Sequence, residues 1–96
     1  MSRRSSFKFL LYVAGDTPNS VAALANITAL CDAHLGGRHE IEIVNVLKNP
    51  KRALTDGIFM TPTLVKLSPH PVQKIVGTLS QNPIVMQALG MEMATS

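Results

Sequence analysis

The residues with the clearest chemistry in this sequence are five cations, and their type favours binding rather than catalysis. Lys48, Lys51 and Arg52 cluster where a short helix is expected to start, and Lys66 and Lys74 lie on an expected hairpin. Cations at a helix N-terminus oppose the helix dipole at a cost of about a few tenths of a kcal/mol. Their placement is weak evidence for an acidic partner surface, toward which they would steer association. Ordinary solvated lysines would give the same pattern.

A polar loop after the first apolar run supplies two further candidates. Asp16 and Asn19 could offer hydrogen bonds to a partner, or could shape the turn and the helix start. Cys31 is the only cysteine, so an internal disulfide is excluded. It recurs at helical spacing with apolar residues, which predicts a small core side chain rather than an exposed, reactive thiol.

The sequence contains no group of residues typical of a catalytic, metal or cofactor site. His34, His39 and His70 are far apart and lack ligand spacing, so we expect no metal site and no cofactor. The formal net charge of +3 is too small to indicate nucleic-acid binding. No segment is long and apolar enough to span a membrane, and the N-terminus lacks the pattern of a signal peptide. We therefore expect a non-enzymatic, cytoplasmic protein.

Periodicity and proline positions predict the elements that hold these residues. A continuous apolar, β-prone run indicates a buried first strand, and Thr17-Pro18, Asn49-Pro50 and Asn82-Pro83 each place a capping residue before a proline at the first helical position. Glu40 and Glu42 alternate with apolar residues, as in an edge strand. The predicted strands are 7–13, 39–46, 61–67 and 72–76, and the predicted helices are 18–35, 50–57 and 83–92.

This order, β-α-β-α-β-β-α, predicts one α/β domain over residues 1–96 with a mixed four-stranded sheet. It is the minimal thioredoxin-like order, with Pro62 where such folds place a cis proline. The first loop, residues 14–18, has no cysteine where thioredoxin-like enzymes carry C-x-x-C.

Several long runs resemble the KaiB family of circadian clock proteins. The clearest is Leu11-Tyr12-Val13-Ala14-Gly15-Asp16-Thr17-Pro18-Asn19-Ser20, close to the family's L-Y-V-A-G-N-T-P-N-S. The resemblance covers about residues 7–90 and continues through 46–50, 61–64, 71–72 and 75–80.

The resemblance implies a non-enzymatic adaptor that binds the ATPase ring of a KaiC-like RecA-type hexamer in a clock, timer or stress-response circuit. It also implies KaiA-like or histidine-kinase regulators as further partners, and it supports Lys66 and Lys74 as docking residues. The family has two folds: a tetrameric ground state with a rearranged C-terminal half, and a thioredoxin-like monomer. The resemblance leaves open which fold the free chain adopts, and whether it is a homodimer or a homotetramer.

The tail departs from the clock-type pattern. Gln81-Asn82-Pro83-Ile84 stands where typical members carry D-R-E-K, and Ala88 stands where they carry glycine. Both changes favour a last helix, so we expect the thioredoxin-like fold to be preferred. Ala22 and Gln73 replace basic residues common in the family, which weakens the case for a clock-type partnership. The alternatives are a signalling module that binds a histidine kinase and, with less support, a redox protein using Cys31.

Overall fold

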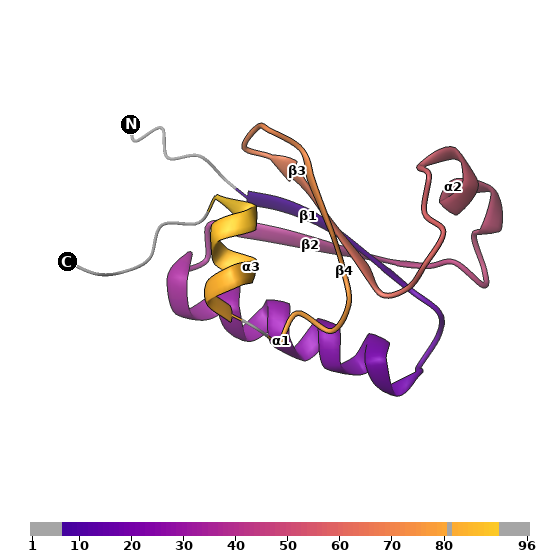
Figure 1. Ribbon diagram of the computed structural model, residues 1–96, viewed down its shortest axis with the longest axis horizontal. Coiled ribbons are helices and arrows are strands. Elements are labelled where there is room, and N and C mark those ends of the chain that lie inside the picture. Colours follow the sequence, from indigo (N-terminus) through magenta and orange to yellow (C-terminus); the bar gives the residue numbers. More distant parts are fainter. Residues whose placement is uncertain (1–6, 81, 91–96) are drawn as a thin grey trace.

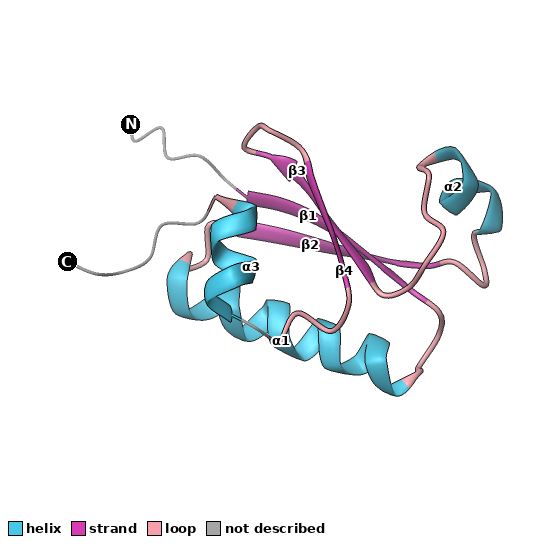
Figure 2. Ribbon diagram, viewed as in Figure 1, coloured by secondary structure: helices cyan, strands magenta, loops and turns pink. Residues whose placement is uncertain are grey.

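The computed structural model describes residues 7–80 and 82–90 and has the predicted order of elements (Figures 1 and 2). All seven elements begin within two residues of their predicted starts, and α2 ends two residues earlier than predicted. The elements are β1 (Phe7–Val13), α1 (Pro18–His34), β2 (His39–Asn45), α2 (Pro50–Thr55), β3 (Thr63–Ser68), β4 (Gln73–Val76) and α3 (Asn82–Leu89).

The four strands form one mixed sheet in the order β2-β1-β3-β4. β1 pairs parallel with β2 and antiparallel with β3, and β3 pairs antiparallel with β4. β2 is an edge strand whose Glu40 and Glu42 are exposed, as predicted. The described chain thus has the thioredoxin-like arrangement, and not the alternative with a rearranged C-terminal half.

The main core lies between one face of the sheet and helices α1 and α3, which Figure 1 shows on the same side. Alternate residues of β1, including Phe9 and Leu11, face this side because successive strand side chains point to opposite faces. Ile27 of α1 and Leu89 of α3 pack against them and are fully buried. This burial fixes both helices against the sheet.

Among the described helices, α2 alone packs against the opposite face of the sheet, at one end (Figure 2). Tyr12, Val44 and Val65 of the sheet pack with Ala53 of α2 and with Ile58, which follows it. The six residues of α2 cannot cover the whole face. The loops around α2 therefore carry much of the surface at this end of the molecule.

The helix starts agree with prediction in position but not in their capping hydrogen bonds. Pro18 and Pro50 occupy the first turns of α1 and α2, yet neither Thr17 nor Asn49 caps its helix through its side chain. The Thr17 hydroxyl donates to Ser20 Oγ at 2.9 Å, and Asn49 Nδ2 donates to the Asn45 carbonyl at 3.1 Å. The Thr17 side chain therefore contacts the side chain of Ser20 in the first turn of α1, and the Asn49 side chain ties the start of α2 to the end of β2.

The C-terminal segment is helical where the sequence predicted it. α3 ends at Leu89, and Gly90 adopts a φ of 71°, a left-handed conformation in which glycine carries no Cβ penalty. Residues 91–92 of the predicted helix lie outside the described residues. The Thr61–Pro62 bond is cis, as expected for a thioredoxin-like fold.

Candidate partner-binding surface

The loops at the C-terminal ends of β1 and β2 meet at one edge of the sheet, because these two strands are parallel. The Asn45 side chain joins them: its Oδ1 accepts hydrogen bonds from the backbone N–H of Gly15 at 3.2 Å and of Leu47 at 3.0 Å. Ser20 supports the first loop by accepting a hydrogen bond from the Ala14 N–H at 3.3 Å. The predicted residues of the first loop and of the α2 start are thus brought to the same end of the molecule.

Asp16 and Asn19 are both exposed at this end. The hydrogen bonds that shape the first loop come from Ser20 and Asn45, which sequence reasoning missed. Asn45 had a detectable signal, since it is a polar residue between Val44 and Val46 at the end of the predicted second strand. Asp16 and Asn19 therefore remain candidates for contact with a partner.

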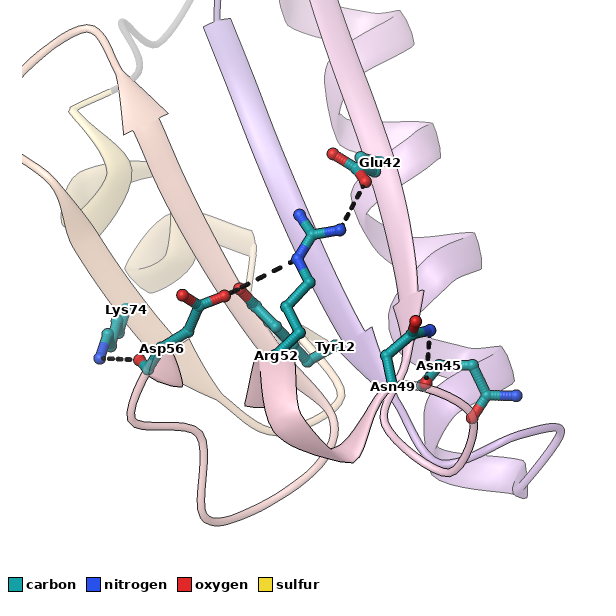
Figure 3. Close-up of polar contacts among 7 residues, drawn as sticks. All are labelled: Tyr12, Glu42, Asn45, Asn49, Arg52, Asp56 and Lys74. Carbon is teal, nitrogen blue, oxygen red and sulfur yellow. Dashed lines mark hydrogen bonds and ion pairs between the residues drawn. The ribbon is translucent and has the colours of Figure 1, made fainter. Parts of the chain in front are cut away.

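Arg52 is held within the protein (Figure 3). Its Nη1 donates to Glu42 Oε2 of β2 at 3.0 Å, and its Nε lies 3.8 Å from Asp56 Oδ2. The hydrogen bond to Glu42 raises the pKa of Arg52, which stays protonated. Asp56 also accepts a hydrogen bond from the Tyr12 hydroxyl. Arg52 therefore anchors α2 to the sheet, in addition to any contact with a partner.

Tyr12 forms the buried side of this network. Desolvation by burial, followed by the hydrogen bond to Asp56, raises the pKa of Tyr12 to about 12. The phenol is therefore protonated near neutral pH and donates to the carboxylate. Tyr12 is 1% exposed and is therefore a core residue rather than a contact residue.

Lys74 lies on β4 and reaches the end of α2. Its Nζ donates to the Asp56 carbonyl at 3.2 Å, while the residue remains exposed (Figure 3). Lys48 and Lys51 are exposed as well, and the side chain of neither makes a hydrogen bond or ion pair within the described part of the chain. These three lysines are exposed and have no ion pair with a carboxylate in the described residues, whereas Arg52 is exposed but paired with Glu42 and Asp56.

Lys66 requires a correction, because it is not an exposed hairpin cation. It is 2% exposed, and its Nζ donates to the Leu89 carbonyl at the end of α3, at 2.7 Å. The ring of Phe7 lies beneath the ammonium, with its centroid 5.9 Å from Nζ. Burial lowers the pKa of Lys66. In this structure Lys66 connects β3 to α3 and is not among the exposed candidate cations.

Large apolar side chains accompany the exposed lysines, and sequence reasoning did not single them out. Phe59 is 86% exposed, Leu54 70% and Met60 64%. They surround a hollow of about 350 Å³ whose lining also includes Val46 and Ile58. A second hollow, of about 150 Å³, shares Ile58, Phe59 and Met60 with the first and is also lined by Lys74 and Val76. We call Leu54, Phe59, Met60 and Val76 the apolar patch.

Cys31 lies in the main core. It is 0% exposed, and desolvation raises the pKa of its thiol to about 12. A reactive cysteine needs an accessible thiolate, which this environment disfavours. The structure thus gives no support to a redox function through Cys31.

We expect the Cys31 thiol to be unreactive in the folded protein. With a chromogenic disulfide reagent at pH 8, the native chain should release almost no thiolate signal, and the chain in denaturant should release one equivalent. Full reaction of the native protein within seconds would contradict the buried placement and revive the redox alternative.

No group of three or more metal-ligating side chains occurs among residues 7–80 and 82–90. The helices described here include none that is both long and apolar enough to cross a membrane. The chemistry at the α2 end is therefore that of a surface with cations, hydrogen-bonding groups and apolar side chains.

Structural comparison supports the fold. The N-terminal domain of Synechococcus elongatus SasA is similar with a TM-score of 0.74 at 18% identity, covering 100% of this chain and 94% of that domain. Chloroplastic thioredoxin z is similar with a TM-score of 0.69 at 17% identity, covering 91% and 81%. At these identities the likeness establishes the thioredoxin-like fold alone.

Sequence comparison identifies the family. The family description "KaiB domain" matches residues 10–91. The circadian clock oscillator protein KaiB of Synechococcus elongatus is 43% identical over 89 residues, which cover 93% of this chain and 87% of that protein. The protein of the same name from Acaryochloris marina is 43% identical over 88 residues, covering 92% and 85%. The chain belongs to the KaiB family.

Proposed function

We propose that this protein is a non-enzymatic adaptor that binds the ATPase ring of a KaiC-like hexamer and modulates its activity or its recruitment of other regulators. The observation that carries the proposal is the 43% identity to clock oscillator KaiB proteins over nearly the whole chain. The buried Cys31 and the absence of C-x-x-C from the first loop argue against the redox function of the thioredoxin neighbours. The circuit would be a cytoplasmic clock, timer or stress response.

The exposed cations fit such a role. Lys48, Lys51 and Lys74 lie near one end of the molecule, where the carboxylates of Glu42 and Asp56 are already paired within the protein. Complementary charges across an interface mainly raise association rates and select the partner. An acidic surface on the ATPase is therefore the expected complement.

A second candidate function is that of a signalling module that binds a histidine kinase. The chain shares its fold, over its whole length, with the SasA N-terminal domain. Ala22 and Gln73, where many family members carry basic residues, also leave room for a changed partner. KaiA-like regulators would be further partners of the adaptor.

We expect the protein to co-elute in gel filtration with the KaiC-like ATPase of its own organism, in a manner that depends on whether ATP or ADP is present. Binding to one nucleotide state of a ring is the behaviour expected of an adaptor that responds to ATPase activity. The elution volume of the protein alone would also distinguish a monomer from a homodimer or homotetramer. Separate elution under every nucleotide condition would contradict the ATPase partnership and favour the kinase alternative.

A charge-matched pair of variants serves as the control for this measurement. Lys48→Glu with Lys51→Glu should slow association with the ATPase at low salt, whereas Lys8→Glu with Arg38→Glu should have a smaller effect. Both pairs change the net charge equally, but Lys8 and Arg38 lie at the opposite end of the sheet, where Lys8 pairs with Glu40. Equal slowing by both pairs would show a general charge effect and no local docking site.

A further inference from the structure

The apolar patch indicates a partner chemistry that the cations alone do not specify. Its four side chains come from α2, from the loop after α2 and from β4, and between 53% and 86% of each is exposed. Soluble proteins seldom expose gathered large apolar side chains without using them for binding. The patch is therefore a candidate contact surface in its own right.

The patch combines projecting side chains with concave sites. Phe59 and Met60 form a shared wall between the hollows of about 350 Å³ and 150 Å³. Pro50, Ala53 and Leu54 of α2 line the larger hollow, and Val76 of β4 lines the smaller one. Such a surface can take apolar side chains from a partner while Phe59 inserts between the partner's own side chains.

The charged groups around the patch are cationic. Lys51 lies three residues before Leu54 on α2, so both side chains lie on the same side of the helix. Lys74 lines the smaller hollow, and its Nζ lies 3.5 Å from the position that a Cβ on Gly57 would occupy. Asp56, the acidic residue closest in sequence, already pairs with Arg52 and Tyr12. A partner with charges complementary to these lysines would therefore present carboxylates around the apolar patch.

We propose that the apolar patch docks an acidic amphipathic segment of the partner, with apolar side chains in the two hollows and carboxylates against Lys51 and Lys74. This deepens the proposed function, on which it rests, by naming the part of the ATPase that would be bound. An anionic membrane is the less suitable occupant. Recognition of anionic lipid usually takes a cluster of about 4–8 cations, whereas this rim has Lys48, Lys51 and Lys74.

The test is the affinity of the full-length protein for the KaiC-like ATPase before and after replacement of one exposed aromatic residue. Phe59→Ser should weaken binding at least about tenfold, as expected for an apolar side chain at the centre of an interface. Val21→Ser is the matched control, because Val21 is 55% exposed on α1, outside the patch, and its loss should change affinity less than about twofold. Circular dichroism should show both variants folded. If Phe59→Ser and Val21→Ser bound the ATPase with equal affinity, the proposed role of the patch would be wrong, whereas the adaptor function would still stand.

A second experiment tests binding to the apolar patch independently of whether the ATPase is the partner. It is a synthetic amphipathic peptide with leucines at helical spacing and glutamates between them, compared with the same peptide carrying lysine in place of glutamate. Amide shifts at Leu54, Phe59, Met60 and Val76 with the acidic peptide only would support the patch even if the ATPase did not bind. No response to either peptide, together with no ATPase binding, would overturn both proposals.

Two other possible occupants of the apolar patch, a second copy of this chain and an anionic membrane, predict different results. If the wild-type protein is a dimer in gel filtration and Phe59→Ser is a monomer, a second copy covers the patch and the proposal is wrong. If the protein sediments with vesicles of anionic phospholipid through Phe59 and ignores the acidic peptide, the patch binds a membrane and the proposal is equally wrong.

Discussion

Replacing Leu89 with alanine is expected to lower the free energy of unfolding by about 2–5 kcal/mol, the usual range for a fully buried leucine. Leu89 is 0% exposed and closes α3 onto the main core. Truncation removes apolar contacts and leaves a cavity that the short helix can only partly fill. Urea denaturation followed by circular dichroism measures the change directly.

Ile84→Ala is the control on the same helix. Ile84 is 62% exposed, so its truncation should change stability by less than about 0.5 kcal/mol. Alanine is also slightly the better helix former, which offsets part of any loss. If Leu89→Ala were no more destabilising than Ile84→Ala, α3 would not be packed on the sheet in solution.

The second large effect is expected from Lys66→Met, which should lower the free energy of unfolding by about 1–3 kcal/mol. The Lys66 Nζ satisfies the Leu89 carbonyl at the C-terminus of α3, where the helix dipole favours a cation. Methionine retains the apolar stem but cannot donate, so the carbonyl loses its buried partner. Hydrogen exchange should speed up first at the amides of the last turn of α3.

Lys48→Met is the control, because Lys48 is exposed and its loss should leave stability nearly unchanged. The two variants also separate the two roles considered for Lys66. If Lys66→Met abolished ATPase binding while stability and exchange stayed at wild-type values, Lys66 would act at a partner surface, as the family resemblance implies. Lost stability with faster exchange in α3 would support the structural role.

The sequence by itself determined the order and type of the elements. The continuous apolar run of β1 and the helical spacing of α1 follow from local patterns, and prolines at residues 18 and 50 mark helix starts because their fixed φ suits the first turn. The absence of C-x-x-C is read directly from the sequence. The core position of Cys31 could be predicted because it depends only on the apolar face of one helix.

Tertiary structure decided which of the predicted cations are available. Arg52 meets Glu42 ten residues away, and Lys66 meets the Leu89 carbonyl 23 residues away, so their engagement depends on how separate elements pack. The same packing leaves Phe59 exposed beside buried Ile58. A phenylalanine close to a strand is usually buried. The residues that neighbour Phe59 in the sequence do not reveal that α2, with six residues, ends too soon to cover it. The sheet and its helices were therefore predictable from local sequence, whereas the proposed docking surface depends on long-range contacts that local patterns do not encode.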